Sequence, residues 1–310
     1  MIFPKKLQKG DTIGIVSPSS QVSAERVTQA EKALKGLGFQ VKLSDNHACC
    51  KGGYMAGEES VRGTWINRMF ADPEVDAIFC MRGGDGANRI IDFIDLDVIR
   101  SNPKIFVGYS DITSLHLLFN QECDLVTFHG PMVSSNIIDH FDAETSAALF
   151  ASLTDDTPTY AYKAPKGMEL QVARHGKAEG LMTGGNLTVM CNALGTFYDM
   201  DTKDKIIFIE EIGGHIGNMD RCIYQLRNAG KLEDAVGILL GQFTECRYET
   251  EHYDMVNILL EATADLNLPI LYNVQSGHGF PMINLPMHAN CRMDTESKTI
   301  VFDMNNSVPV

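Results

Sequence analysis

The sequence contains no long apolar segment. No stretch of its 310 residues approaches the roughly 18 consecutive apolar residues that a membrane-spanning helix needs. The N-terminal sequence, MIFPKKLQKGD, also lacks the apolar core of a signal peptide. We therefore expect a protein without a membrane segment that is made and kept in the cytoplasm.

Positive charge is scarce. The 26 Lys and Arg residues stand against 40 Asp and Glu residues, which gives a formal net charge of −14. An acidic surface repels the phosphates of nucleic acids and the headgroups of anionic lipids. We therefore expect neither a nucleic acid nor a membrane surface among the partners of this protein.

Patterns for disulfides, metal ions and nucleotides are missing as well. The eight cysteines are scattered along the chain without a CxxC pair, so we expect free thiols. No cluster of His and Cys has the spacing of metal ligands. Neither a GxGxxG motif nor a P-loop lysine pattern is present. The sequence therefore predicts no metal ion and no cofactor.

The first half of the chain alternates short apolar runs with helical patterns. The expected strands are 12–16, 41–43, 75–81 and 105–109, and the expected helices are 23–37, 61–70, and two that start at Ala87 and Asp111. Strands that alternate with helices at these lengths pair in parallel. We therefore predict an α/β fold with a parallel sheet in this half.

The pattern lapses between residues 151 and 171, where two prolines and several threonines follow no period. We interpret this segment as a connection between a first domain, 1–150, and a second domain, 172–310. In the second domain the expected strands are 206–209, 236–240 and 270–274, and the expected helices are 220–229 and 253–264. Isolated glycines are more frequent here, so we predict a smaller and more irregular α/β domain.

Ser110 is the first candidate for chemistry. It lies in GYSD, between an apolar run and an amphipathic helical segment. A serine at a strand-to-helix turn has the geometry of a nucleophile elbow, and the helix N-terminus stabilises negative charge beside it. The full GxSxG pattern is absent, so a second interpretation stays open, in which Ser110 only caps the helix. Asp111 can also cap that helix.

The segment RGGDG, from Arg82 to Gly86, also follows an expected strand and precedes an expected helix. Paired glycines let the backbone turn sharply and leave N–H groups free to face an anion. The segment is therefore a candidate phosphate cradle or half of an oxyanion hole. A plain glycine turn is the alternative.

Glu210 and His278 are candidates for the other half of a catalytic site. Glu210 ends the apolar run IIFIE, and His278 lies between two glycines in SGHGF. A serine nucleophile needs a base within hydrogen-bond reach, and the base needs an acceptor that orients it. Spacing along the chain neither proves nor excludes this combination. His129 and His215 are weaker candidates for the base.

Seven motifs in order resemble those of one family. They are GDTIGIVSPSS, FADPEVDAIFCMRGGDGANRIID, VGYSDIT, TFHGPM, GLMTGGNL, IIFIEEIG, and GHG before MINLP. Together they resemble the serine L,D-carboxypeptidases, a group that also contains the microcin C resistance peptidases. The resemblance implies a flavodoxin-like N-terminal domain, a second α/β domain, a site in the cleft between them, and a homodimer.

The resemblance also implies roles for individual residues. Ser110 corresponds to the nucleophile, Glu210 to the carboxylate and His278 to the base of that family. The oxyanion donors correspond to backbone N–H groups near Gly84 and at Asp111. One departure concerns the substrate, because many relatives have RGGYG where this chain has Asp85.

The sequence therefore predicts a hydrolase that removes the terminal D-alanine from muropeptide tetrapeptides in the cytoplasm. The alternatives are an aminoacyl-nucleotide amide hydrolase of the microcin C type and a non-catalytic protein that binds a small ligand. Arg82, Gly83 and Asp85 are candidate substrate contacts. Candidates for holding the terminal carboxylate are Arg82, Arg89, Arg174 and Arg247.

Overall fold

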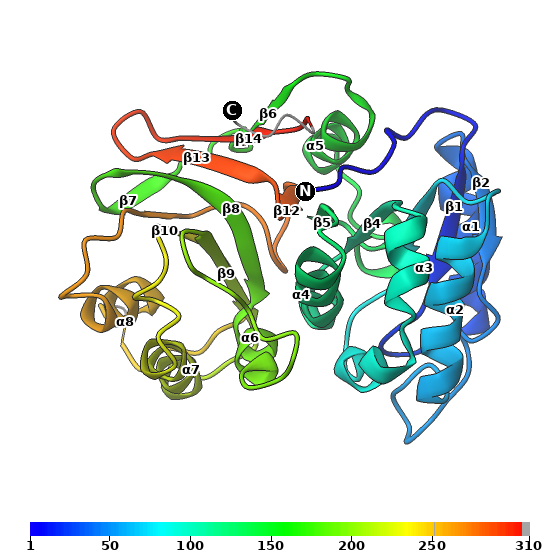
Figure 1. Cartoon of the computed structure of the whole chain (residues 1–310), viewed down its shortest axis with the longest axis horizontal. Coiled ribbons are helices and arrows are strands. Elements are labelled where there is room, and N and C mark those ends of the chain that lie inside the picture. Colours follow the sequence, from blue (N-terminus) through cyan, green and yellow to red (C-terminus); the bar gives the residue numbers. More distant parts are fainter. Residues whose placement is uncertain (251, 306–310) are drawn as a thin grey trace.

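The computed structural model describes residues 1–250 and 252–305 and contains two sheets (Figure 1). Within these residues the first sheet has the order β12-β5-β4-β3-β1-β2. Its strands are β1 Thr12–Val16, β2 Gln40–Leu43, β3 Ala77–Cys80, β4 Ile105–Gly108, β5 Thr127–His129 and β12 Leu285–Met287. Strands β1 to β5 are parallel. Their order, 2-1-3-4-5, is that of the flavodoxin-like folds, so the predicted fold class is confirmed.

Helices follow the strands of this half, and those over 24–36, 59–71 and 113–122 match predicted ones, whereas those over 96–101 and 143–154 were not predicted. They are α1 Ala24–Gly36, α2 Glu59–Ala71, α3 Leu96–Ser101, α4 Thr113–Glu122 and α5 Ala143–Thr154, with the short turns η1 Ala87–Phe93, η2 Ser110–Ile112 and η3 Val133–Ile137. α1 begins where the Ser23 side chain accepts a hydrogen bond from the backbone N–H of Arg26. It ends before Gly38, whose φ of 95° lies in the left-handed region that glycine adopts easily. The helix expected from Ala87 is a 3-10 helix instead.

The second sheet has the order β6-β14-β13-β8-β9-β10-β11-β7 in the described part of the chain. Its strands are β6 Thr159–Ala161, β7 Gln171–Arg174, β8 Lys177–Asn186, β9 Ile206–Ile212, β10 Gly237–Thr244, β11 Ile270–Tyr272, β13 Asn290–Asp294 and β14 Thr299–Asp303. β8 to β11 are parallel, and the outer strands are antiparallel. The helices of this half are α6 Leu187–Ala193, α7 Ile216–Asn228 and α8 Met255–Ala262.

The segment 151–171 is not the unstructured connection that the sequence suggested. α5 continues to Thr154, because Asp142 caps its first turn and Leu149 and Leu153 are buried. β6 then pairs with β14. The mixed polar composition hid both elements, since each of them buries only a few side chains. The division of the chain into two domains stays a prediction.

The two halves of the chain are joined through the first sheet and through both clusters of buried apolar side chains. β12 comes from the second half of the sequence and pairs with β5 of the first sheet, with Leu285 opposite His129. α4 lies between the two sheets and contacts β8 and α6 (Figure 1). Both clusters of buried apolar side chains contain residues from both halves. No helix in the described residues is long and apolar enough to cross a membrane.

Candidate functional site

The loops after β1, β3 and β4 meet at the carboxyl edge of the first sheet. In sheets of this order, ligands bind where the strand order reverses, which is here between β1 and β3. The loop after β1 contacts the loop after β3 directly. The backbone N–H of Ser20 donates to the carbonyl of Gly83 at 3.4 Å, and the N–H of Asp85 donates to Ser20 Oγ at 3.2 Å.

Ser110 lies on a strained turn between β4 and α4. Its φ is 66°, in the left-handed region that side chains other than glycine rarely adopt. A Cβ atom built on Gly83 would lie 3.1 Å from Ser110 Oγ, so the RGGDG backbone lies against the serine. The N-cap positions are Tyr109 for η2 and Ile112 for α4. The alternative in which Ser110 is only a helix cap is therefore wrong.

The side chain of Asp111 does not cap α4, which corrects the sequence interpretation. Its Oδ2 instead accepts a hydrogen bond of 2.8 Å from the backbone N–H of Ala87, at the start of η1. The carboxyl group is buried, and burial raises its pKa to about 6. The side chain of Asp111 thus joins the turn at Ser110 to the end of the RGGDG segment.

Two further features fix the RGGDG segment. Gly84 has a φ of 117°, and a Cβ atom at this position would lie 2.1 Å from Ser20 Oγ, so only glycine fits. Arg62, on α2, is almost completely buried and donates hydrogen bonds to the carbonyl oxygens of Gly86, Gly57 and Pro18. Sequence reasoning missed Arg62. Its position on the same helical face as Ile66 and Met69 was a usable signal.

Glu210 and His278 are in direct contact. His278 Nδ1 lies 2.7 Å from Glu210 Oε2, and the Glu210 side chain is fully buried. Gly277, with a φ of 135°, allows this approach, because a Cβ atom there would lie 3.0 Å from Glu210 Oε2. The ring of Tyr109 packs edge-on against the His278 imidazole, with 4.8 Å between centroids. The residue before Ser110 therefore contacts the imidazole that Glu210 holds.

The neighbouring carboxylate, Glu211, has a different environment. Successive side chains of a strand point to opposite faces, so Glu211 points away from His278. It accepts hydrogen bonds from Asn186 Nδ2, from the backbone N–H and hydroxyl of Thr188, and from the Ile212 N–H. Glu211 therefore holds the start of α6, whereas Glu210 contacts the imidazole.

The other candidate histidines lie in unsuitable places for a base. His129 is fully buried, and both of its ring nitrogens lack a hydrogen-bond partner among the described residues. Burial lowers its pKa well below the usual value. His215 lies on the surface, caps α7 and pairs with Glu249 at 2.6 Å.

The four candidate arginines differ in their surroundings. Arg174 donates to Thr263 Oγ1 and to the carbonyl of Leu268, which precedes β11. It therefore lies at the amino end of β11, whereas Glu210 lies at the carboxyl end of β9, and β9, β10 and β11 are parallel. This position at the opposite end of the strands removes Arg174 from the four candidates for holding a substrate carboxylate.

The other three arginines differ in how near they lie to Ser110 and in what already binds them. Arg89 forms an ion pair of 2.6 Å with Glu59. Arg247 lies beside Gly214, in the loops that follow β10 and β9. Arg82 is exposed, and its Nε donates to the Gly83 carbonyl at 3.2 Å, next to the proposed oxyanion segment. Of these, Arg82 is the one that the structure places within the loop beside Ser110.

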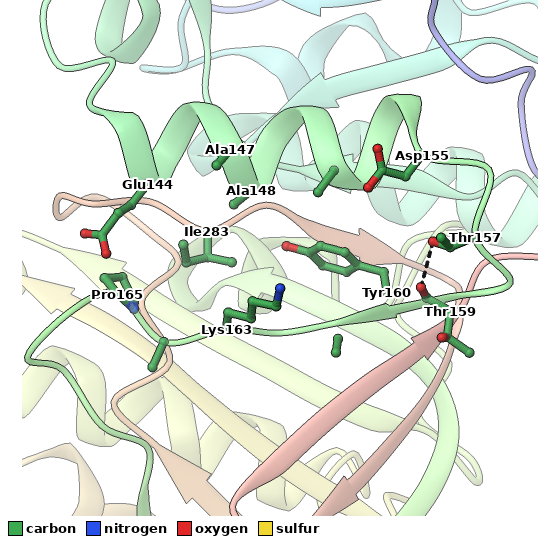
Figure 2. A pocket seen from close by; sticks show the side chains of 13 residues that line it. Glu144, Ala147, Ala148, Asp155, Thr157, Thr159, Tyr160, Lys163, Pro165 and Ile283 are labelled. Atoms are coloured by element: carbon green, nitrogen blue, oxygen red, sulfur yellow. Dashed lines mark hydrogen bonds between the residues drawn. The ribbon is translucent and has the colours of Figure 1, made fainter.

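A pocket of about 570 Å³ lies elsewhere, between α5 on one side and β6 with the segment that follows it on the other. Figure 2 shows alanines of α5 on one side and Tyr160 and Lys163 on the other. None of the predicted site residues lines this pocket. In the described part of the chain no group of three or more His, Cys, Asp or Glu residues is placed to hold a metal ion.

The fold and these groups together indicate the class to which the protein belongs. It is a two-sheet α/β protein with a serine on a strained strand-to-helix turn and a histidine paired to a buried carboxylate, which are the groups that serine hydrolases use. The chain belongs to the LD-carboxypeptidase family. The family models of the N-terminal and C-terminal domains match residues 13–130 and 179–293. The predicted resemblance is confirmed.

Three relatives illustrate this family. The probable murein peptide carboxypeptidase of Bacillus subtilis is 38% identical over 97% of this chain and 94% of its own length. The microcin C7 self-immunity protein of Escherichia coli is 25% identical over 95% of this chain and 93% of its own length. The structure of the muramoyltetrapeptide carboxypeptidase from Oxalobacter formigenes has a TM-score of 0.83 at 24% identity, over 96% of this chain and 100% of that one. The last likeness concerns the fold.

Proposed function

We propose that this protein is a serine L,D-carboxypeptidase that removes the terminal D-alanine from muropeptide tetrapeptides in the cytoplasm. In this proposal Ser110 is the nucleophile, His278 the general base and acid, and Glu210 the group that orients His278. The observation that carries the proposal is the 2.7 Å contact between His278 Nδ1 and Glu210 Oε2, beside the turn at Ser110. The 38% identity to a probable murein peptide carboxypeptidase supports the substrate class.

The proposed reaction has two acyl-transfer steps. Because Nδ1 of His278 faces Glu210, Nε2 is the nitrogen that takes the proton of Ser110. The serine oxygen bonds to the amide carbon, and backbone N–H groups near Gly84 and at Asp111 stabilise the oxyanion. His278 then gives the proton to the leaving amine of D-alanine. A water molecule attacks the acyl-enzyme in the same way and releases the tripeptide.

The substrate contacts in this proposal come from the loop after β3. The N–H of Asp85 is occupied by Ser20 Oγ, and its exposed carboxylate is the substrate contact that we propose. Arg82 supplies the charge for the terminal carboxylate, and Gly83 lets the chain lie close to Ser110. As in the family that the sequence resembles, we propose a homodimer.

Similarity to the microcin C7 self-immunity protein supports a second candidate, the hydrolysis of an aminoacyl-nucleotide amide. Asp85 favours this candidate where the substrate carries a free amine near the scissile bond, because opposite charges attract. A non-catalytic binding protein remains a third outcome of the test described next.

The test compares kcat/KM for an L,D-linked muropeptide tetrapeptide and for its isomer with L-alanine at the end. Inverting one α-carbon exchanges the directions of the methyl group and the carboxylate. A misplacement of about 1 Å costs on the order of a hundredfold in rate, so we expect at least that preference for the L,D isomer. A processed microcin analogue serves as the third substrate, and mass spectrometry detects all products.

Equal kcat/KM values for the two isomers would contradict the carboxypeptidase assignment. Rapid cleavage of the microcin analogue alone would select the second candidate. Binding of the tetrapeptide without turnover of any substrate would select the third.

A further inference from the structure

His278 lies on a loop that is closed at its base by the backbone. The N–H of Ile283 donates to the carbonyl of Gln275 at 2.7 Å, and the N–H of Gln242 donates to the carbonyl of Ser276 at 3.0 Å. Between these bonds the loop, residues 276–282, belongs to no helix or strand. Gly277 and Gly279 flank His278 and have no side chains with which to anchor it.

The side chain of Gln242, near the end of β10, holds the middle of this loop. Its Oε1 accepts a hydrogen bond of 2.8 Å from the backbone N–H of Gly279. Its Nε2 donates to Gln275 Oε1 at 3.0 Å and to the carbonyl of Pro281 at 3.5 Å. A Cβ atom at Gly279 would lie 2.6 Å from Gln242 Nε2, so the loop backbone lies directly against the amide.

The orientation of this amide is fixed by a second glutamine. Gln275 Nε2 donates to the carbonyl of Asn273 at 3.1 Å and to its Oδ1 at 2.6 Å. Gln275 Oε1 must therefore face Gln242 as an acceptor, which requires the Nε2 of Gln242 on that side. The Oε1 of Gln242 is then the atom that faces Gly279. The Gln275 backbone is held in turn, because its N–H donates to the Tyr162 hydroxyl at 2.8 Å.

We propose that Gln242 is a positioning residue, which acts on the reaction by holding the His278 loop in register with Glu210 and Ser110. This inference rests on the proposed function. The Glu210 contact fixes one nitrogen of the imidazole, and Tyr109 packs against its ring, but neither bonds the loop backbone. Gln242 bonds the backbone one residue after His278, so its loss lets the imidazole drift from the serine.

The test is Gln242→Met, which keeps the length of the side chain and removes its hydrogen bonds. We expect kcat to fall about 10- to 100-fold with KM changed less than about threefold, because the misplaced group is the base and not a substrate contact. Amide hydrogen exchange across residues 276–283 should become faster. Gln242→Glu keeps an acceptor for the Gly279 N–H but sets an oxygen against Gln275 Oε1, so it should recover only part of the lost kcat.

Gln171→Met is the matched control. Gln171 and Gln242 line the same surface pocket, but no hydrogen bond of the Gln171 side chain is present among the described residues. We expect Gln171→Met to leave kcat and the exchange of the loop unchanged.

Wild-type kcat in Gln242→Met, or unchanged exchange at residues 276–283, would overturn this inference alone. Failure of the wild-type protein to hydrolyse the tetrapeptide would instead overturn the proposed function. In that case we would compare wild type and Gln242→Met by the rate at which a fluorophosphonate labels Ser110, in place of kcat. Equal exchange of the loop in Gln242→Met and wild type would still overturn the role of Gln242.

Discussion

The two sides of the candidate site are built in different ways. On the side of the first sheet, backbone geometry dominates: Ser110 has a positive φ, and Gly84 leaves no space for a side chain. On the side of the second sheet, side chains make the arrangement: Glu210 contacts His278, and Gln242 bonds the loop of His278. A substitution on the first side therefore acts through one reacting atom or through the fold, whereas one on the second side acts through the orientation of an imidazole.

The largest effect should come from Ser110→Ala, which removes the proposed attacking atom. We expect kcat to fall by about 10⁴-fold or more, because removal of a triad nucleophile costs orders of magnitude in rate. The thermal unfolding midpoint should change little, since Ser110 is partly exposed and only its hydroxyl is lost. Steady-state kinetics and thermal unfolding check both expectations. Substantial hydrolysis by this variant would reassign the nucleophile.

The adjacent carboxylates of β9 provide the second test. Glu210→Gln keeps the shape of the side chain but removes the charge that orients His278, so we expect kcat to fall about 10³- to 10⁴-fold. Glu211→Gln places an amide group against hydrogen-bond donors at the start of α6. It should lower the free energy of unfolding by about 1–3 kcal/mol with kcat nearly unchanged.

Denaturant unfolding and kcat, measured on both variants, separate the two carboxylates. If Glu211→Gln lost activity without losing stability while Glu210→Gln stayed active, the assignment of the two side chains would have to be exchanged.

A smaller effect is expected from the buried carboxyl group of Asp111. Its pKa in the folded protein is raised to about 6, above the ordinary value of 3.8, because it is buried. Between these values the folded state binds more protons than the unfolded state, so the contribution of Asp111 to stability falls as the pH rises from about 4 to about 6. Asp111→Asn keeps an acceptor for the Ala87 N–H and removes this loss.

We therefore expect Asp111→Asn to equal the wild type in stability near pH 4 and to exceed it by up to about 3 kcal/mol at pH 7. Denaturant unfolding at four pH values between 4 and 7 measures the difference. A constant difference across this range would show that Asp111 does not titrate there.

Four parallel strands of the first sheet, β1 to β4, could be predicted because each is a short run with apolar residues that ends before a loop or a helix. β5 was missed, since it has only three residues and includes His129. β13 and β14 carried a usable signal, because buried residues such as Cys291, Met293, Ile300 and Phe302 alternate with more exposed ones. α6 was missed as well, although Asn186 is a typical N-cap.

The candidate site also has one part that the sequence indicates locally and one part that it does not. The turn at Ser110 leaves a local signal, because strand, turn and helix follow one another along the chain. The contact between Glu210 and His278 joins positions 68 residues apart, and no spacing rule predicts it. The residue patterns made Glu210 and His278 separate candidates, and the family resemblance assigned them to one site. The burial of Arg62 depends on three loops that meet around it, and the hydrogen bonds of Gln242 depend on the loop that follows β11. Neither residue type therefore indicated its role.

The place of β12 in the first sheet bears on how the protein is made. During synthesis the strands β1 to β5 leave the ribosome well before Leu285–Met287, which cover the edge of β5. An uncovered strand edge offers unpaired N–H and C=O groups to other chains. The nascent sheet that carries Ser110 therefore stays exposed to mispairing until almost the whole described chain has been translated, and its protection depends on the arrival of a three-residue strand.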